Sequence, residues 1–462
     1  MKKITILLLA ITFYTASYSQ TPLPNQLQEF LAAIDNCLLT NPVDGLCTNS
    51  QYGEMPDWDV SSVTDMQQAF ANKENFNADI SQWNVSNVSI MRNMFFGAHS
   101  FNQDITGWNT ANVSVMDQMF YEAYVFNQSI GTWDTSNVID MYYMFYEASA
   151  FDGDISNWDT SNVSDMRSLF RGASVFNGDI GSWDVSNVTD MTEFFYAATA
   201  YNQQLNDWDT SNVTIMLDMF AGASAFNQSL NDWDTSNVTS MYGMFAEASI
   251  FNGDITDWDV SSVTDMTYMF FRANNFNQPL NDWDIGNVIY TTNMFAEASA
   301  FNGDISSWDI SSVTNMGSMF SLSGFSTNNY DAILNSWSQQ DVQSGVVLGA
   351  FGVNYCNGAD ARQSLEDNNG WIITDAGLDC STASIDDKNQ LDISIYPNPT
   401  SDIVYIDGNY TQLKVIIYNV LGKEILNKSI TNSIDISHLD NGVYILQLSD
   451  GVKLSTRKII KN

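Results

Sequence analysis

The chain has 462 residues, and its 54 acidic residues outnumber its 16 Lys and Arg residues, so its formal net charge is −38 at pH 7. Binding to nucleic acid requires a basic surface, so this charge excludes nucleic acid as a partner. Anionic membrane surfaces are disfavoured for the same reason.

Residues 1–19 have the pattern of a signal peptide. Lys2 and Lys3 precede an apolar run, Ile4–Phe13, and small residues lead to Gln20. The run is too short to span a membrane, and no other stretch is both long and apolar enough to do so. We therefore expect an exported protein without a transmembrane segment.

Residues 20–57 are predicted to form an N-terminal cap that begins with an amphipathic helix. Its apolar face carries Leu27, Phe30, Leu31, Ile34 and Leu38. Such a cap covers the first unit of a repeat array.

Four cysteines in an exported chain indicate two disulfides. Two lie in the N-terminal cap and two lie beyond the last repeat. Of the three possible pairings, the local one is the simplest: Cys37–Cys47 and Cys356–Cys380. A metal site is the alternative, but no histidine lies near any of them in the sequence.

A 25-residue unit then recurs eleven times without insertion or deletion, and each copy contains one tryptophan. These are Trp58, Trp83, Trp108, Trp133, Trp158, Trp183, Trp208, Trp233, Trp258, Trp283 and Trp308. A fixed period in this range indicates a repeat architecture in which each unit buries its apolar face against its neighbours.

Each unit is interpreted as a short strand followed by one or two helical turns. The strand holds the tryptophan and a β-branched residue two positions later, such as Val60. A Thr or Ser column, beginning at Thr64, suggests helix N-caps, and Met241, Met244 and Phe245 have helical spacing.

The tryptophans are predicted to lie in the core. The rival interpretation, an exposed aromatic row that stacks on sugars, would place them on the face of the flanking acids, which the alternation of a strand forbids.

The repeat F-N-x-D-I-x-x-W-D-x-S-N-V-T-D-M-x-x-M-F-x-x-A resembles the BspA-like leucine-rich-repeat family of bacterial surface proteins over residues 58–320. The resemblance implies an α/β repeat fold, a curved leucine-rich-repeat solenoid of eleven units with parallel strands on its inner face and short helical turns outside. It also implies a role in adhesion or surface recognition, with no catalytic residues to transfer. Thr291 and Ala69 depart from the pattern.

Residues 321–380 are predicted to form a C-terminal cap, and residues 381–391 a linker. Residues 392–462 contain short alternating runs bounded by turn residues, which predict a small all-β, Ig-like sandwich. Its motifs resemble the type IX secretion C-terminal sorting domain; they include Tyr396, Pro397, Asn398, Pro399, Gly442, Tyr444, Lys458 and Lys461. The resemblance implies passage across the outer membrane by the type IX secretion machinery, then removal of this domain and attachment to the cell surface or release. An Ig-like accessory domain would explain the strands but not the motifs.

Acidic residues flank the tryptophan in four successive units. The candidate binding patch consists of Asp207, Asp209, Asp232, Asp234, Asp257, Asp259, Asp282 and Asp284. Carboxylates on neighbouring rows repel one another, so such a patch is expected either to raise its pKa values or to hold cations, with Ca²⁺ as the natural candidate. The alternative is a solvated face that keeps the protein soluble.

The sequence predicts a recognition or adhesion protein that binds an extracellular protein or glycan through the acidic concave face. A Ca²⁺-stabilised surface or matrix component without a specific ligand is the alternative. A polysaccharide-acting enzyme is a remote one, because no unit departs locally to form an acid–base site and neither His99 nor His438 lies near a second unusual polar group. No cofactor is required.

Overall fold

The computed structural model describes residues 22–48, 50–381, 393–408, 410, 412–419, 423–450 and 454–462. The chain divides into two compact units, Met1–Asp379 and Cys380–Asn462. The signal peptide expected at residues 1–19 lies outside the described residues, as does the expected linker beyond Ser381. No helix in the described part of the chain has the length and apolar character needed to cross a membrane.

The N-terminal cap contains the predicted helix. Helix α1 (Leu27–Leu38) buries Phe30, Ile34 and Leu38, and Phe30 contacts the Trp83 ring edge-on at a centroid distance of 6.4 Å. A short 3₁₀ helix, η1 (Met55–Asp57), leads into the first repeat. The predicted Cys37–Cys47 disulfide is confirmed.

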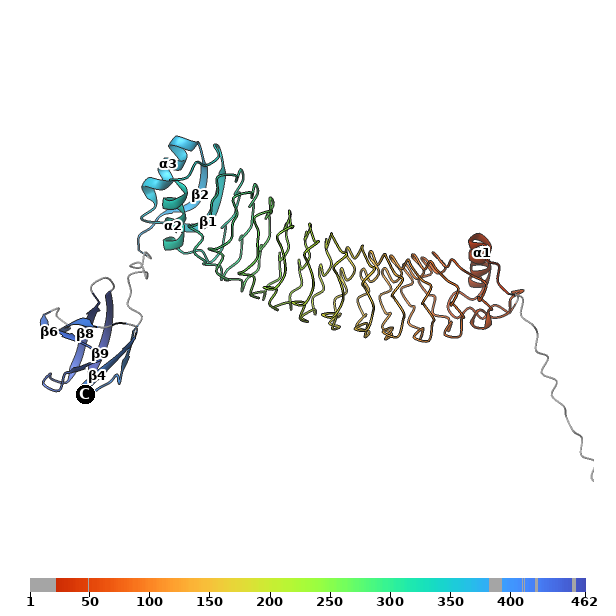
Figure 1. Cartoon of the computed structure of the whole chain (residues 1–462), viewed down its shortest axis with the longest axis horizontal. Helices are drawn as coiled ribbons and strands as arrows, with labels where there is room; N and C mark the ends of the chain where they lie inside the picture. The colour runs from red at the N-terminus through yellow and green to blue at the C-terminus, as the bar shows by residue number, and fades with distance from the viewer. Residues whose placement is uncertain are drawn as a thin grey trace, which may run out of the picture. The chain divides into compact units, whose positions relative to one another are not determined.

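The repeats stack as a row of coils between α1 and the C-terminal cap (Figure 1). Equivalent residues of adjacent coils form single parallel bridges, such as Asp65 with Ile90 and Ile90 with Val115. Within residues 58–326, all of which the structure describes, the backbone consists of turns, with no helix and no extended strand. The predicted leucine-rich-repeat solenoid, with parallel strands inside and helical turns outside, is therefore wrong.

The backbone conformation explains why no helix forms. Two positions in every coil have positive φ, for example Gln68 (59°) and Asn72 (59°), whereas an α-helix requires φ near −60°. Alternate amides donate to the next coil, as Gln68 N–H does to Arg92 O at 2.9 Å, while Ala69 N–H closes a turn on Met66 O at 3.2 Å.

The Thr and Ser column does not cap helices. Instead most of these hydroxyls contact the preceding coil: Thr214 Oγ1 donates to the carbonyl oxygen of Thr189 at 3.1 Å, and Thr239 Oγ1 donates to Thr214 O at 3.1 Å. The column therefore joins coils rather than beginning helices.

The tryptophans form the core of the coils, as predicted. All eleven are at most 4% exposed, and neighbouring indoles stack, as Trp108 and Trp133 do at 6.3 Å and 5°. Each ring N–H is satisfied; Trp108 Nε1 donates to Ile80 O at 3.2 Å. Burial of about 150–250 Å² per tryptophan stabilises each coil by about 4–6 kcal/mol as an upper limit.

The C-terminal cap of this unit contains α2 (Thr327–Trp337), β1 (Val347–Tyr355), α3 (Ala359–Asn369) and β2 (Ile372–Leu378), and β1 pairs in parallel with β2. Strand β1 continues the coil stack through Met316 and Leu348. Cys356 and Cys380 are both disulfide-bonded, and the described residues include no free cysteine.

The second unit is all-β, in agreement with the predicted small sandwich. One antiparallel sheet has the order β3 (Ile393–Tyr396), β4 (Ile403–Gly408), β7 (Ser433–Asp435). The other has the order β6 (Glu424–Ile430), β5 (Leu413–Asn419), β8 (Gly442–Ser449), β9 (Leu454–Lys461). Val404, Val415, Ile417, Leu446 and Ile459 are fully buried in its core.

Candidate binding surface

The four Asp residues that follow the tryptophans shape the coil turns. All are exposed, and each carboxylate accepts the backbone N–H two residues later. The distances are 3.1 Å for Asp209, 3.0 Å for Asp234, 3.0 Å for Asp259 and 3.1 Å for Asp284. This is the local bond of an Asx-turn, which fixes the chain after the tryptophan.

Three of the four Asp residues that precede the tryptophans also have partners. The Asn206 side-chain amide donates to Asp232, Asn231 Nδ2 donates to Asp257 Oδ2 at 2.8 Å, and Asn281 Nδ2 donates to Asp282 Oδ1 at 2.7 Å. Asp207 is exposed like the others. Ladders of side-chain amides therefore offset part of the repulsion between rows.

The expected increase in pKa is not observed at Asp209 and Asp259. The pKa of each carboxyl is lowered, because the hydroxyl and backbone amide of Ser211 or Ser261 donate to it. Nowhere in the described ranges do three or more His, Cys, Asp or Glu side chains form a group that could hold a metal ion. The arrangement thus lends no support to a Ca²⁺ site, which remains a prediction.

A second surface, missed in the sequence, lies on the stretch of each coil that follows the buried Phe. Phe96, Tyr121, Tyr146, Arg171 and Tyr196 occupy equivalent positions in five successive coils, are partly exposed, and are called the aromatic row here. Their rings stack face to face: 4.4 Å and 9° for Phe96 with Tyr121, and 4.3 Å and 0° for Tyr121 with Tyr146.

Arg171 continues the row as a planar cation. Its guanidinium lies 5.6 Å from the ring centroid of Tyr146 and 4.0 Å from that of Tyr196, and it forms an ion pair with Glu193. Cation–π contacts of this kind add to the stack. The row is therefore continuous from Phe96 to Tyr196.

Further aromatic side chains lie beside the row. Tyr143 meets the rings of Tyr121 and Tyr146 edge-on, at 6.1 and 5.1 Å, and the Arg167 guanidinium lies 4.9 Å from the Tyr142 ring centroid. Burial raises the pKa of Tyr142 to about 12.

Beyond Tyr196 the row is interrupted. Ala221 and Ala246 occupy the next two equivalent positions, and a ring returns at Phe271. The gap forms a cavity of about 360 Å³, called the notch here, lined by Tyr196, Ala197, Asp218, Ala221, Gly222, Tyr242, Ala246, Glu247, Tyr268 and Phe271.

Asp218 is the unusual polar group of the notch. No donor to its carboxylate is found among the described residues. Burial and, to a smaller extent, the charge of Glu193 raise its pKa to about 6, and Arg171 opposes this increase. Gly243 makes room for it, because a Cβ at this position would overlap an Asp218 oxygen. The carboxylate is thus half-buried and faces open space.

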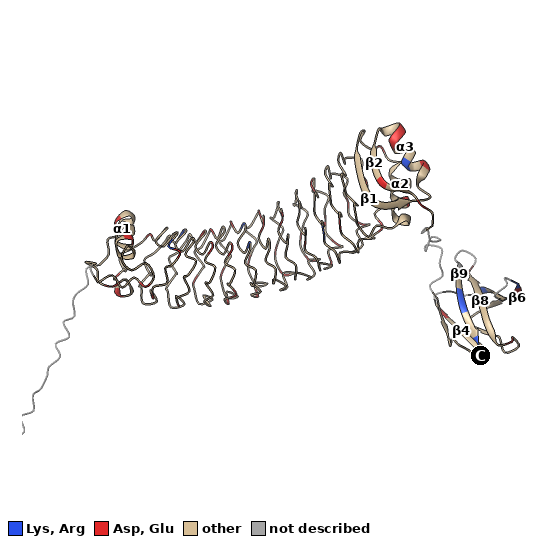
Figure 2. Ribbon diagram, turned by 180° about the vertical axis from the view of Figure 1, so that it is seen from behind, with Lys and Arg blue, Asp and Glu red and all other residues tan. Residues whose placement is uncertain are grey.

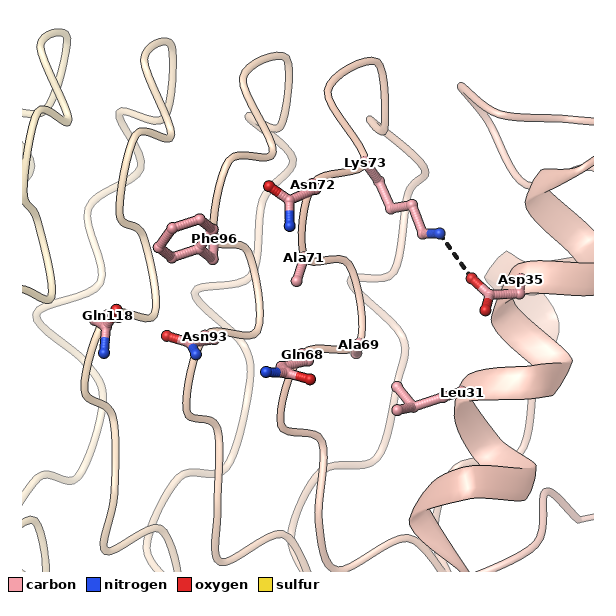
Figure 3. A pocket seen from close by; sticks show the side chains of 10 residues that line it. All are labelled: Leu31, Asp35, Gln68, Ala69, Ala71, Asn72, Lys73, Asn93, Phe96 and Gln118. Carbon is pink, nitrogen blue, oxygen red and sulfur yellow. Dashed lines mark hydrogen bonds and ion pairs between the residues drawn. The ribbon is translucent and has the colours of Figure 1, made fainter.

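Another cavity, of about 480 Å³, lies where α1 meets the first coils. Figure 3 shows Gln68, Asn93 and Gln118 lined up along successive coils, and Lys73 reaching to Asp35 on α1 at 2.7 Å. Asn93 Oδ1 is buried and has no hydrogen-bond donor in the described part of the chain.

Variation among the repeats at equivalent positions could have located the aromatic row from the sequence. In the eleven repeats most core positions barely vary, whereas the position after the buried Phe holds Ala, Phe, Tyr, Arg and Ser. The repeats contain five basic residues. Lys73, Arg171 and Arg272 lie on the same stretch, and Arg92 and Arg167 each lie three residues before the buried Phe. Four of them pair with acids across coils or with a cap, as Arg92 does with Asp117 at 2.8 Å.

In the second unit, the sorting motif residues join the first and last strands. Asn398 Nδ2 donates to Lys458 O at 2.8 Å and its Oδ1 accepts from Ile460 N–H at 2.9 Å. Tyr396 stacks on Tyr405 at 5.9 Å, and Pro397 and Pro399 both follow cis peptide bonds.

The remaining motif residues lie on β8 and β9. Gly442 pairs with Lys461, and the Tyr444 hydroxyl donates to Asp440 O at 2.9 Å. Lys458 is exposed, whereas Lys461 is buried. Basic residues colour β9 blue in Figure 2.

Comparison with protein families identifies both parts of the chain. Residues 45–155, 126–233 and 225–337 each match the family described as "Mycoplasma protein of unknown function, DUF285", and together these segments span more than half of the chain. The chain belongs to the DUF285 family. The resemblance to the BspA-like leucine-rich-repeat family is not confirmed, since the DUF285 match covers the same repeats. A search of curated proteins gave no match.

Residues 394–462 match the secretion system C-terminal sorting domain, which confirms the resemblance drawn from the motifs. This DUF285 protein is therefore a type IX secretion substrate. It is carried across the outer membrane to the cell surface or the extracellular space.

Proposed function

We propose that this secreted DUF285 protein is a recognition or adhesion protein rather than an enzyme, and that it binds an extracellular protein or glycan through the aromatic row. One observation carries the proposal: a partly exposed stack of four rings and one guanidinium continues across five coils whose interior is fully packed.

Physical reasons favour this surface over the acidic patch. Tyrosine and other aromatic side chains provide most of the binding energy in many interfaces, because they bury large areas at little conformational cost. Stacking holds these rings in place before a ligand arrives, which reduces the entropy lost on binding. The patch carboxylates, by contrast, are engaged by Ser amides and Asn side chains of the coils themselves.

The test uses the full chain, immobilised and probed with an array of extracellular proteins and glycans. We expect saturable binding to at least one ligand, and a loss of about 10–100-fold in affinity, or about 1.4–2.7 kcal/mol, for the Tyr121→Ala/Tyr146→Ala double variant. The matched control is Asp232→Asn/Asp257→Asn, which is expected to bind like the wild type. Weaker binding in the control with unchanged binding in the Tyr variant would return the contact surface to the acidic patch.

A further inference from the structure

The notch has a shape and a charge that specify a ligand chemistry. We propose that it binds the guanidinium group of an arginine side chain on a partner protein, which stacks on Tyr196 in place of the first missing ring. This inference rests on the proposed function, because it names the chemistry of one contact on the same face.

Arg171 is an internal precedent for the occupant. It occupies the position of a ring in the aromatic row, stacks against Tyr196 at 4.0 Å and pairs with Glu193. Tyr196 thus has a guanidinium on one side and the small Ala221 on the other. The notch offers the second face of the same ring to a second guanidinium.

The dimensions suit planar groups. Tyr196 and Phe271 are three coils apart, and a parallel-stranded spacing of about 4.8 Å per coil places them about 14 Å apart. Adjacent rings in the filled row are separated by 4.3–4.4 Å, so two planar layers fit between the walls. Ala221, Gly222 and Ala246 leave this space clear.

The charge of the notch requires a donor-rich cation. The half-buried Asp218 carboxylate has no donor from the described residues and lines the cavity beside Glu247. A guanidinium supplies several N–H donors in a plane and pairs with carboxylates through two parallel bonds, whereas an ammonium provides neither the plane nor the fork. The −38 charge of the chain further favours a basic partner.

The neighbours of Asp218 determine how pH acts on the site. Burial raises its pKa to about 6, Glu193 contributes to this increase, Arg171 opposes it, and Tyr242 lines the same cavity. Glu247 is already paired with Arg272 at 2.9 Å. Protonation of Asp218 below about pH 6 removes the free carboxylate, so arginine binding should weaken there.

The experiment compares two short, end-blocked peptides that differ only in arginine or citrulline, which has nearly the same shape but no charge. Calorimetric titration of the full chain at pH 7.5 should show saturable binding of the arginine peptide and at least 10-fold weaker binding of the citrulline peptide. Ala221→Tyr/Ala246→Tyr fills the notch with residues that the row accommodates elsewhere, and it should reduce arginine binding at least 10-fold. Asp218→Asn should do the same without changing the shape of the cavity.

The matched control is Asp257→Asn, an exposed carboxylate away from the notch, which should bind the arginine peptide like the wild type. Circular dichroism and melting temperature establish that each variant is folded. Equal binding of the two peptides, or unchanged arginine binding in the filled variant, would overturn the inference. A filled notch that loses a neutral glycan while keeping arginine would overturn it as well, in favour of a sugar site.

The two proposals fail in different ways. If Tyr121→Ala/Tyr146→Ala weakens binding to the array ligand while the filled notch still binds arginine, the proposed function stands and the notch inference is wrong. If the row variant leaves the array ligand unaffected, the proposed function fails whatever the notch binds.

Discussion

Each coil presents two stretches to its surroundings, and they differ in kind. The Trp stretch repeats with little change, and its exposed Asp residues accept bonds from the same coil or its neighbour. The stretch after the buried Phe changes from coil to coil, and places stacked rings, cations and a cavity at the surface. Repetition here accompanies structural roles, and variation accompanies the surface that we propose binds a ligand.

The difference follows from what each position contacts. An indole in the Trp stretch is enclosed by the coils before and after it, so any change leaves a void in both. A side chain in the aromatic row stacks on its neighbours through its faces and remains partly exposed to solvent, so Phe, Tyr, Arg and Ala are all accommodated. A comparison of matched substitutions on the two stretches tests this contrast.

The largest effect should come from shortening a core ring. We expect Trp158→Ala to destabilise the first unit by about 3–5 kcal/mol, because it removes a large buried side chain and leaves a cavity. Tyr146→Ala removes a partly exposed side chain of the aromatic row, and it should lower the free energy of unfolding by less than about 1 kcal/mol. Thermal and urea unfolding of both variants provides the measurement, and comparable losses would show that the row is part of the core.

A smaller effect on stability, of opposite sign, is expected when Asp218 in the notch is replaced. The folded-state pKa of Asp218 is raised to about 6 from its ordinary value of 3.8, so the folded protein binds more protons between these values and loses stability as pH rises through this window. Asp218→Asn should therefore stabilise the protein by about 1–2 kcal/mol at pH 8, after allowance for its exposed half, and leave stability unchanged below about pH 4. Melting temperatures across this range test it, and a variant less stable than the wild type at pH 8 would show that the carboxylate has a structural partner.

The sequence was sufficient for the packing but not for the backbone. The 25-residue period and the tryptophans placed the core correctly, and the Cys37–Cys47 disulfide, α1 and the sorting domain were also predicted. The predicted helical turns were wrong, because the spacing of Met241, Met244 and Phe245 also suits consecutive turns whose apolar residues point inward. The clue was a scatter of glycines at one position, Gly97, Gly172 and Gly222, where φ is positive in every coil.

The aromatic row, the surface that we propose binds a ligand, was harder to predict for a physical reason. The two columns of Asp residues suggested mutual repulsion. The sequence interpretation did not consider that the Ser or Gly two residues after each Asp that follows a tryptophan donates its backbone N–H to the carboxylate and completes an Asx-turn. The aromatic row depends on coil-to-coil stacking at a single position. The row can be recognised in the sequence only when the residue after the buried Phe is compared from one repeat to the next.

A modest effect is expected in the turns of the Trp stretch. Asp209→Ala removes a carboxylate that accepts from Ser211 N–H and Oγ at 3.1 and 2.6 Å, and should cost about 0.5–1.5 kcal/mol at pH 7. The pKa of this carboxyl is lowered on folding, so its contribution is present above pH 3.8 and is lost as pH falls through the folded-state value. Asp207→Ala, for which the described residues provide no hydrogen bond, is the control and should be neutral; equal losses in both variants would remove the distinction between the two acid columns.

The smallest effect concerns calcium. A high-affinity site would stabilise the folded protein in proportion to the logarithm of the Ca²⁺ concentration above its Kd. The patch carboxylates, however, already accept hydrogen bonds from Ser, Gly and Asn donors, and no described group of three acids converges. We expect the melting temperature of the chelated protein to change by less than about 1 °C up to millimolar Ca²⁺, with Mg²⁺ as the control for ionic strength. A saturable rise with Ca²⁺ alone, abolished by Asp234→Asn/Asp259→Asn, would mean that the Trp stretch binds a ligand after all, and that the division between a structural and a recognising stretch does not hold.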